Sequence, residues 1–379
     1  MIQSPTPFIM DGHVHMINRQ FYLGGDISDH YSNGQVDLPR MRKGGVNAIF
    51  FSIYTSDEYY ANRFEWKQTM ILMDLALRQI QKNEDYIELA LTASDIERIY
   101  KQGKIAAFLH LEGAFDLDGD LGLLRNLYRL GLRSTTLVAH NSTNHFADSC
   151  GSHGRWGGVT AHGVEVIHEM NRLGMLIDLA HASDETIHQA AEASRDPVLY
   201  SHGGSQFFVN IPRNISDEAV RLIAANGGVI GLQFGNSMNN PKYFDWLEKN
   251  KISHPAAPSS KSAAVFTKIE AVHEAVAKEY PPEPAEIPEE VRMPVDQMVY
   301  VLDHWIKLVG EDHVSLGSDL DGWPALAKGM RDISDFPLLI TAMREHGWSD
   351  QRIRKIAGLN LLHLIRQVTE KQQPAMTSP

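Results

Sequence analysis

The sequence predicts an α/β fold, a (β/α)₈ barrel of the TIM type, and three of its features lead to this prediction. Short apolar runs rich in β-branched residues alternate with longer segments of helical period along most of the chain. Eight such apolar runs occur, and each is compatible with a strand buried on both faces. The length of 379 residues accommodates eight successive βα units. An open α/β sheet with a similar number of strands is the alternative.

The eight predicted strands follow one another through the chain. In order they are Phe8–His15, Val46–Tyr54, Ile105–Glu112, Ser134–His140, Met175–His181, Pro197–His202, Val229–Gly235 and Val314–Asp319. Segments of helical period between them include 121–130, 160–173 and 217–225. Ser216 is expected to cap the start of the last of these helices. Gly174 is expected to close the second, because glycine readily adopts the left-handed conformation found at helix ends.

The longest interruption lies between the seventh and eighth predicted strands and spans roughly 75 residues, which is unusual for a connection in a compact domain. It contains two proline-rich stretches, 254–260 and 281–284. We interpret it as a helical excursion that either covers the mouth of the barrel or contacts a partner subunit in a homodimer. A surface loop is the alternative. We therefore expect a single domain over residues 1–370, followed by a disordered polar tail at 371–379.

Composition limits the partners and the compartment. The net charge of −12, without a long basic run, argues against nucleic acid or an anionic membrane and favours a small-molecule substrate. The single cysteine, Cys150, excludes both an intrachain disulfide and a thiolate cluster. No uninterrupted apolar run reaches the length of about 18 residues that a membrane span needs. Because the first residues also lack the apolar core of a secretion signal, we expect a cytoplasmic protein.

Polar side chains gather at the carboxyl ends of the predicted strands. In chain order they are His13, His15, Glu112, His140, His181, His202 and Asp319. In a barrel these strand ends converge on one rim, which is where such folds build active sites. Each histidine taken singly also fits a structural role in the core, so the joint pattern carries the argument. His110 lies on the same strand face as Glu112 and is a candidate for a supporting role.

This set of side chains indicates metal chemistry. Imidazole and carboxylate ligands without a cysteine cluster favour a hydrolytic metal, with zinc (Zn2+) as the first expectation. A carboxylate on a middle strand, such as Glu112, can bridge two ions that activate a water and polarise an acyl oxygen. Asp319 is placed to take the proton of that water and pass it to a leaving amine. Asp321 is the rival, and we prefer Asp319 because it lies nearer the strand end.

Six segments together resemble the membrane (renal) dipeptidase family, peptidase family M19, whose members are amidohydrolase-like. They are Asp11–His13, Glu112–Gly113, Gly158–Ser183, Ser201–His202, Arg213–Asn214 and Gly317–Gly322. The resemblance runs from about Phe8 to Leu364. It implies a metallopeptidase with two zinc ions per subunit that cleaves dipeptides, often tolerating a D-residue at the C-terminal position. An N-acyl amino acid, a lactam or another amide is an alternative substrate, and a non-catalytic binding homologue is a third possibility.

The resemblance also implies roles for individual residues. Glu112 is similar to the bridging carboxylate, His181 and His202 to the ligands of one zinc, and His13 to a ligand of the other. The resemblance further assigns two residues to the substrate. His140 is similar to the histidine that stabilises the oxyanion of the substrate carbonyl.

Arg213 is similar to the arginine that holds the substrate carboxylate. This role suits a guanidinium, because it pairs with a carboxylate through two parallel hydrogen bonds.

His15 departs from the family pattern, which has an aspartate at this position. A histidine remains a plausible ligand, but a neutral group then replaces an anionic one. We therefore expect a lower pKa for the bridging water and weaker retention of the first ion. The substitution His15→Asp should slow the loss of one zinc equivalent during dialysis against a chelator, followed by metal content over time. Two ions held equally tightly by both proteins would contradict this expectation.

Overall fold

Nine parallel strands form one sheet in the computed structural model, which describes residues 7–32, 34–56, 60, 64–113, 120–151, 154–252, 268–278, 287–322 and 324–371. The strands are β1 (Ile9–Val14), β2 (Val46–Tyr54), β3 (Ile87–Leu89), β4 (Ile105–Glu112), β5 (Ser134–Thr136), β6 (Leu176–Asp178), β7 (Leu199–Gly203), β8 (Val229–Leu232) and β9 (Val314–Leu316). All except β3 follow one another around a nearly closed barrel. Val14 pairs with Leu320 where the two ends of the sheet meet. The prediction of a (β/α)₈ barrel is confirmed.

All eight predicted strands are present, and the structure adds β3. This strand has three residues and pairs with the first residues of β4, whereas β5 pairs further along with His110 and Leu111. A segment this short carries too few residues to show a strand pattern. Several predicted strands extend beyond the observed ones, because the chain leaves the sheet before it reaches the polar residue at the rim.

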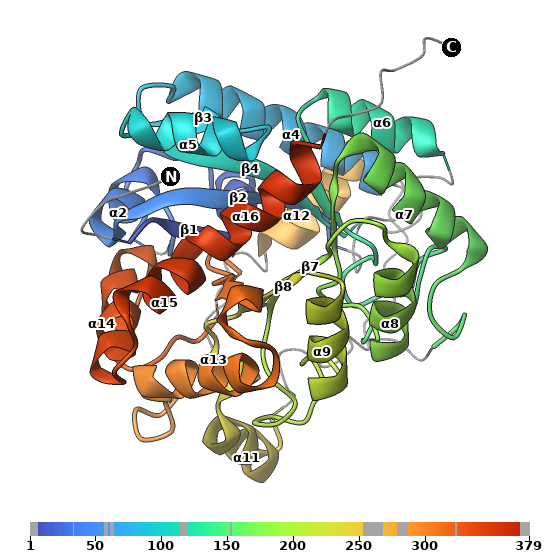
Figure 1. The fold of residues 1–379 in the computed structure, drawn as a ribbon. Coiled ribbons are helices and arrows are strands. Elements are labelled where there is room, and N and C mark those ends of the chain that lie inside the picture. Colours follow the sequence, from blue (N-terminus) through green and yellow to red (C-terminus); the bar gives the residue numbers. More distant parts are fainter. Residues whose placement is uncertain are drawn as a thin grey trace.

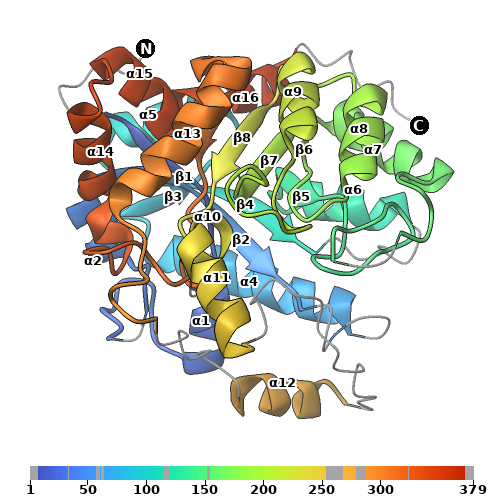
Figure 2. The same ribbon diagram turned by 90° about the horizontal axis from the view of Figure 1, so that it is seen from below.

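Helices surround the barrel on its outer side (Figures 1 and 2). They are α1 (Met16–Leu23), α2 (Leu38–Gly44), α4 (Glu65–Lys82), α5 (Ala93–Lys101), α6 (Leu121–Arg129), α7 (Ala161–Leu173), α8 (Asp184–Ala193), α9 (Asp217–Ala225), α10 (Asn236–Asn239), α11 (Pro241–Asn250), α12 (Ile269–Lys278), α13 (Val295–Val309), α14 (Phe336–Glu345), α15 (Asp350–Arg354) and α16 (Asn360–Thr369). Both predicted helix caps are confirmed. The side chain of Ser216 accepts a hydrogen bond from the backbone N–H of Ala219, and Gly174 has φ 75°.

The excursion between β8 and β9 is helical, as predicted, and contains α10, α11, α12 and α13. Helix α12 buries Ile269, Val272 and Val276 in a small apolar cluster with Tyr60, and it also contacts α1. The proline-rich stretches 254–260 and 281–284 lie outside the described residues, as does the predicted tail beyond Lys371. The contact with a partner subunit stays a prediction.

The interior of the barrel is apolar at the amino ends of the strands. Phe50, Phe108 and Leu199 from three different strands pack there against Leu361 and Ile365 of α16. Figure 1 shows α16 (red) crossing this end of the barrel in front of β1 and β2. The helix therefore closes one end of the barrel with apolar side chains, and the polar side chains are confined to the other end.

An irregularity in β1 turns His13 into the barrel. Met10 belongs to the interior apolar cluster, so strict alternation would place Val14 inside as well. Val14 instead belongs to the core between the strands and the helices. The pairing of β1 with β2 shifts register between Asp11 and Val14. This bulge exchanges the two faces of the strand and brings His13 to the inner side.

Gly317, directly after β9, should tolerate no side chain. An added Cβ would collide with the carbonyl oxygen of Ser201 in β7, a backbone atom that cannot move aside by itself. We expect Gly317→Ala to lower the free energy of unfolding by about 1–3 kcal/mol, as for other overpacked interiors. Urea denaturation measures this loss.

The matched control is Gly154→Ala. An added Cβ there would lie 3.4 Å from Asp148 Oδ2, which is an ordinary contact. We expect a change of no more than about 0.5 kcal/mol for this exposed position. Equal stability of the two variants would show that β7 and β9 do not approach as closely as described.

Candidate metal centre

Glu112, at the end of β4, lies between two pairs of histidines. Its Oε2 atom is 3.2 Å from Nε2 of both His13 and His15. Its Oε1 atom is 3.0 Å from Nε2 of His181 and 3.7 Å from Nε2 of His202. The two oxygens of one carboxylate therefore face two different groups of nitrogen donors.

The distances among these donor atoms fit metal binding. Zinc–nitrogen bonds of about 2.0 Å in a tetrahedral arrangement place neighbouring ligand atoms about 3.3 Å apart. His13 Nε2 lies 3.0 Å from His15 Nε2, and His181 Nε2 lies 3.2 Å from His202 Nε2. Within the described residues, His13, His15 and Glu112 form one group that could hold an ion, and Glu112, His181 and His202 form a second. The donor set therefore fits two ions that share Glu112.

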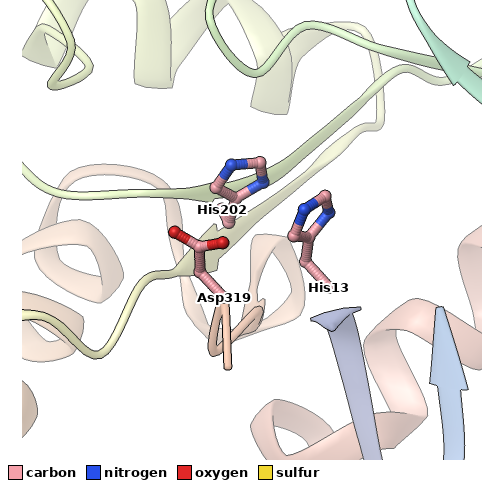
Figure 3. Close-up of side chains that lie close together, drawn as sticks. All are labelled: His13, His202 and Asp319. Atoms are coloured by element: carbon pink, nitrogen blue, oxygen red, sulfur yellow. The ribbon is translucent and has the colours of Figure 1, made fainter. Parts of the chain in front are cut away.

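Asp319 faces the same space from beyond the end of β9. Figure 3 shows its carboxylate close to the rings of His13 and His202, and these three residues form a further group of possible metal donors. Asp319 Oδ1 lies 3.0 Å from His15 Nε2, and Oδ2 accepts a hydrogen bond of 3.0 Å from Gln233 Nε2. The carboxylate is thus held on both sides.

Asp321, the alternative to Asp319, is engaged elsewhere. Its carboxylate forms a buried ion pair with Arg19 at 3.1 Å and accepts a hydrogen bond from the backbone N–H of Gln35 at 2.6 Å. These contacts tie the loop after β9 to α1. Asp319 is therefore the one of the two carboxylates that belongs to a donor group, and its role in proton transfer stays a prediction.

Three residues of the site have left-handed backbone conformations that are rare for non-glycine residues: φ is 54° at His140, 67° at His181 and 63° at Asp319. Specific hydrogen bonds hold two of them in place. The Ser149 hydroxyl donates to the carbonyl of His140, and the Cys150 N–H donates to that of His181, each over 2.8 Å. Such strain collects at functional sites when the surrounding structure enforces it.

The outer ring nitrogens of three histidines are also engaged. Each Nδ1 atom has a polar side chain beside it, so the Nε2 atom faces the site. The pairs are His13 with Ser52 at 3.1 Å, His181 with Asn141 at 3.1 Å and His202 with Ser201 at 2.8 Å. The Ser201 hydroxyl in turn donates to the buried carboxylate of Asp178 at 2.5 Å.

Burial and neighbouring charges set the pKa values in the site. Burial, reinforced by nearby positive charge, lowers the pKa of His181 and His202 well below the ordinary value, so both rings are neutral, as metal ligands must be. Burial raises the pKa of Glu112, but the charges of His13 and His15 outweigh it and hold this pKa well below its ordinary value.

The pair of His15 and Asp319 shows the same competition. Burial lowers the pKa of His15, but the charges of Glu112 and Asp319 outweigh burial and raise it. Burial raises the pKa of Asp319, but the hydrogen bond and charge of His15 outweigh this effect and lower it. Asp319 is therefore an ionised carboxylate at neutral pH.

The two predicted substrate-binding residues lie beside the donor groups. His140 Nε2 is 3.9 Å from Glu112 Oε1, and its ring lies against that of His181 with centroids 4.2 Å apart. Arg213 is only 4% exposed, and its Nη2 atom lies 2.9 Å from His181 Nε2. The structure thus brings together every site residue that the sequence predicts.

Sequence reasoning did not single out Gln233 and Tyr54. Gln233 follows β8 and holds Asp319, and Tyr54 ends β2 with its ring 5.1 Å from that of His140. Gln233 is the one polar side chain in the run from Val229 to Phe234, so the rule used for the other strand ends would have found it. Tyr54 gives no such signal, because an aromatic residue is ordinary in a strand.

His110 occupies the supporting position that its strand face predicts. It is fully buried one layer below Glu112, where its Nδ1 atom lies 3.1 Å from the Ser134 hydroxyl. Its Nε2 atom lies 3.4 Å from the carboxylate of Asp178. Burial lowers the pKa of His110 well below the ordinary value. His110 therefore contributes a neutral ring to a polar layer beneath the donor groups.

The whole chain matches one family of known proteins. The model described as "Membrane dipeptidase (Peptidase family M19)" covers residues 2–378. The chain belongs to this family. Dipeptidase verJ of Clonostachys rogersoniana is 31% identical over 344 residues, which are 88% of this chain and 76% of that relative. The M19 membership makes this protein a hydrolase, a metal-dependent dipeptidase.

Solved structures support the M19 fold. The probable dipeptidase PvdM from Pseudomonas aeruginosa has a TM-score of 0.78 at 22% identity, over 96% of both chains. A metallopeptidase from Rhodobacter sphaeroides, liganded with a phosphinate mimic of the dipeptide L-Ala-D-Ala, has a TM-score of 0.74 at 22% identity, over 96% of this chain and 99% of that one. In the described part of this M19 chain, every helix is too short or too polar to cross a membrane.

The shared position of Glu112 predicts an unequal loss of metal in two variants. Glu112→Gln should lose both ions, because this carboxylate offers one oxygen to the group with His13 and His15 and the other to the group with His181 and His202. His15→Ala removes a donor from the first of these groups and should spare the second. Metal content after gel filtration measures both effects.

Glu169→Gln is the matched control. Glu169 pairs with Arg125 and Arg172 on the outside of the barrel, so this variant should keep the wild-type metal content. A Glu112→Gln protein that retains one tightly bound ion would show that the carboxylate is not shared.

Proposed function

We propose that this protein is a binuclear zinc dipeptidase that hydrolyses the peptide bond of dipeptides, including those with a D-residue at the C-terminal position. The observation that carries the proposal is the position of Glu112, which presents one oxygen to each of two histidine pairs. The imidazole and carboxylate donors suit zinc. When bound, two zinc ions would supply an activated water and polarise the substrate carbonyl.

Asp319 acts as the proton-transferring group. Its carboxylate is ionised, because His15 holds the pKa low against the effect of burial. Gln233 donates a hydrogen bond to one of its oxygens, so the group is oriented before substrate binds. It takes a proton from the attacking water and gives a proton to the amine nitrogen that leaves when the peptide bond breaks.

His140 and Arg213 bind the substrate. His140 lies 3.9 Å from Glu112 and donates to the carbonyl oxygen as negative charge develops there. Arg213 pairs with the terminal carboxylate of the dipeptide, which sets how far the substrate reaches into the site. A buried guanidinium at the edge of the donor groups favours short substrates that end in a carboxylate.

A second candidate is an amidohydrolase acting on an N-acyl amino acid, a lactam or another non-peptide amide. Arg213 would bind the carboxylate of any such compound, so the same residues serve both functions. The dipeptidase verJ is 31% identical to this chain, and its name favours the peptide substrate. A non-catalytic homologue is the weaker alternative, because all predicted site residues meet. A cytoplasmic location and a homodimer stay predictions.

A substrate panel and one variant test the proposal. Zinc-loaded protein should release amino acids from several L-L and L-D dipeptides, and Asp319→Asn should lower the rate by at least about 100-fold with unchanged zinc content. Asp312→Asn, at a carboxylate exposed to 68%, should keep the full rate.

Two results would change the assignment. If the wild-type protein cleaves no dipeptide in the panel, the dipeptidase proposal fails, and hydrolysis of N-acyl amino acids would support the second candidate. If Asp319→Asn loses zinc together with activity, Asp319 is a metal ligand and not the proton-transferring group.

A further inference from the structure

We infer that Tyr200 is a positioning residue for substrate binding, whose hydroxyl holds the guanidinium of Arg213 in the orientation that receives the terminal carboxylate. This inference rests on the proposed function and deepens it, because it assigns the part of the site that selects substrates with a free carboxylate. Tyr200 lies within the apolar run that forms β7 and touches none of the donor groups.

The Tyr200 hydroxyl contacts Arg213 at two points. It accepts a hydrogen bond of 3.0 Å from Arg213 Nη1 and donates one of 3.0 Å to the carbonyl oxygen of the same residue. Tyr200 itself is 2% exposed. An added Cβ at Gly203 would lie 2.5 Å from the ring of Tyr200, so the glycine leaves the space that the ring occupies. One rigid hydroxyl therefore fixes both the head group and the backbone of Arg213.

The loop that carries Arg213 is held independently of Tyr200. The side chain of Asn214 donates to the carbonyls of Val209 and Met238, each over 2.8 Å. The N–H of Ile215 donates to the carbonyl of Gly204 at 3.0 Å. These bonds fix the backbone around Arg213, but its long side chain needs its own restraint, because the rotamers of an arginine carry considerable entropy.

The guanidinium of Arg213 is held by neutral groups among the described residues. Its Nη2 atom donates to the carbonyl of His202 at 3.1 Å and lies beside His181. In the described part of the chain, Arg213 forms no ion pair with a carboxylate. A guanidinium that is 4% exposed and lacks a carboxylate partner is costly unless a ligand supplies one. The positive charge of Arg213 is thus available to an anionic ligand, while Tyr200 holds Nη1 and the His202 carbonyl holds Nη2.

The test is Tyr200→Phe, which removes only the hydroxyl. We expect the KM for L-Ala-L-Ala to rise about tenfold or more, the usual effect of losing a hydrogen bond to a charged group, with kcat within about twofold of wild type. For the C-terminal amide of the same dipeptide, which lacks the negative charge, the two proteins should differ in KM by less than about twofold. A general loss of structure would affect both substrates equally.

Two further measurements separate positioning from folding. In the Arg213→Lys background, which lacks Nη1, Tyr200→Phe should add no further rise in KM. Tyr60→Phe is the matched control, because it also removes a buried hydroxyl, bonded to Tyr22 at 2.9 Å. It should leave KM unchanged, and zinc content should be equal in all variants. If Tyr200→Phe does not fold, Arg213→Lys removes the same hydrogen bond from the other side and should raise KM for the dipeptide alone.

The outcomes distinguish the inference from the proposed function. If the wild-type protein cleaves dipeptides and Tyr200→Phe keeps the wild-type KM, the inference is wrong and the dipeptidase proposal stands. If the wild-type protein cleaves no dipeptide, the dipeptidase proposal fails. Calorimetric affinities of the same variants for a phosphinate dipeptide and its C-terminal amide then still test Tyr200, and equal affinities in wild type and Tyr200→Phe would overturn the inference.

Discussion

The rest of the site depends on one buried carboxylate. Glu112 is 2% exposed, and an isolated charge in such a place is strongly unfavourable. The protein compensates by bringing histidines from β1, from the turn after β6 and from β7 to within 3.0 to 3.7 Å of its two oxygens. To bring the histidines to Glu112, the backbone forms the bulge in β1 and the left-handed turn at His181. The local irregularities of the barrel therefore have a common cause.

The apolar core and the polar donor groups occupy opposite ends of the barrel. Apolar side chains fill the end that α16 closes, and the donor groups lie at the other end. Between them lies a thin polar layer, in which His110 and Asp178 are fully buried and lie 3.4 Å apart. This layer separates the apolar core from the charged site. It also lies where hydrogen-bond partners are needed for the outer ring nitrogens of the histidines.

The sequence predicted the fold best for strands that are buried on both faces, because burial gives them a simple apolar pattern. Parallel strands covered on both faces are continuous apolar runs, so all eight barrel strands were predictable, whereas three-residue β3 was not. Site residues such as Glu112 and His202 were predictable from their place at strand ends. Tyr200 was not, because a tyrosine inside an apolar run looks like core until its hydroxyl is seen to contact Arg213.

The meeting of β1 and β9 also has a consequence for biosynthesis. The N–H of Asp319 donates to the carbonyl of His13, and the N–H of His15 donates to the carbonyl of Leu320. The site therefore combines residues from opposite ends of the chain. Contacts between residues so far apart in sequence form late, because the intervening loop must close first. A nascent chain that has not yet emerged beyond β9 already holds both groups of donors that share Glu112, but it lacks Asp319. The last part of the barrel to be synthesised therefore both joins the two ends of the sheet and brings Asp319 to the donor groups, so closure of the barrel and completion of the site are one late event.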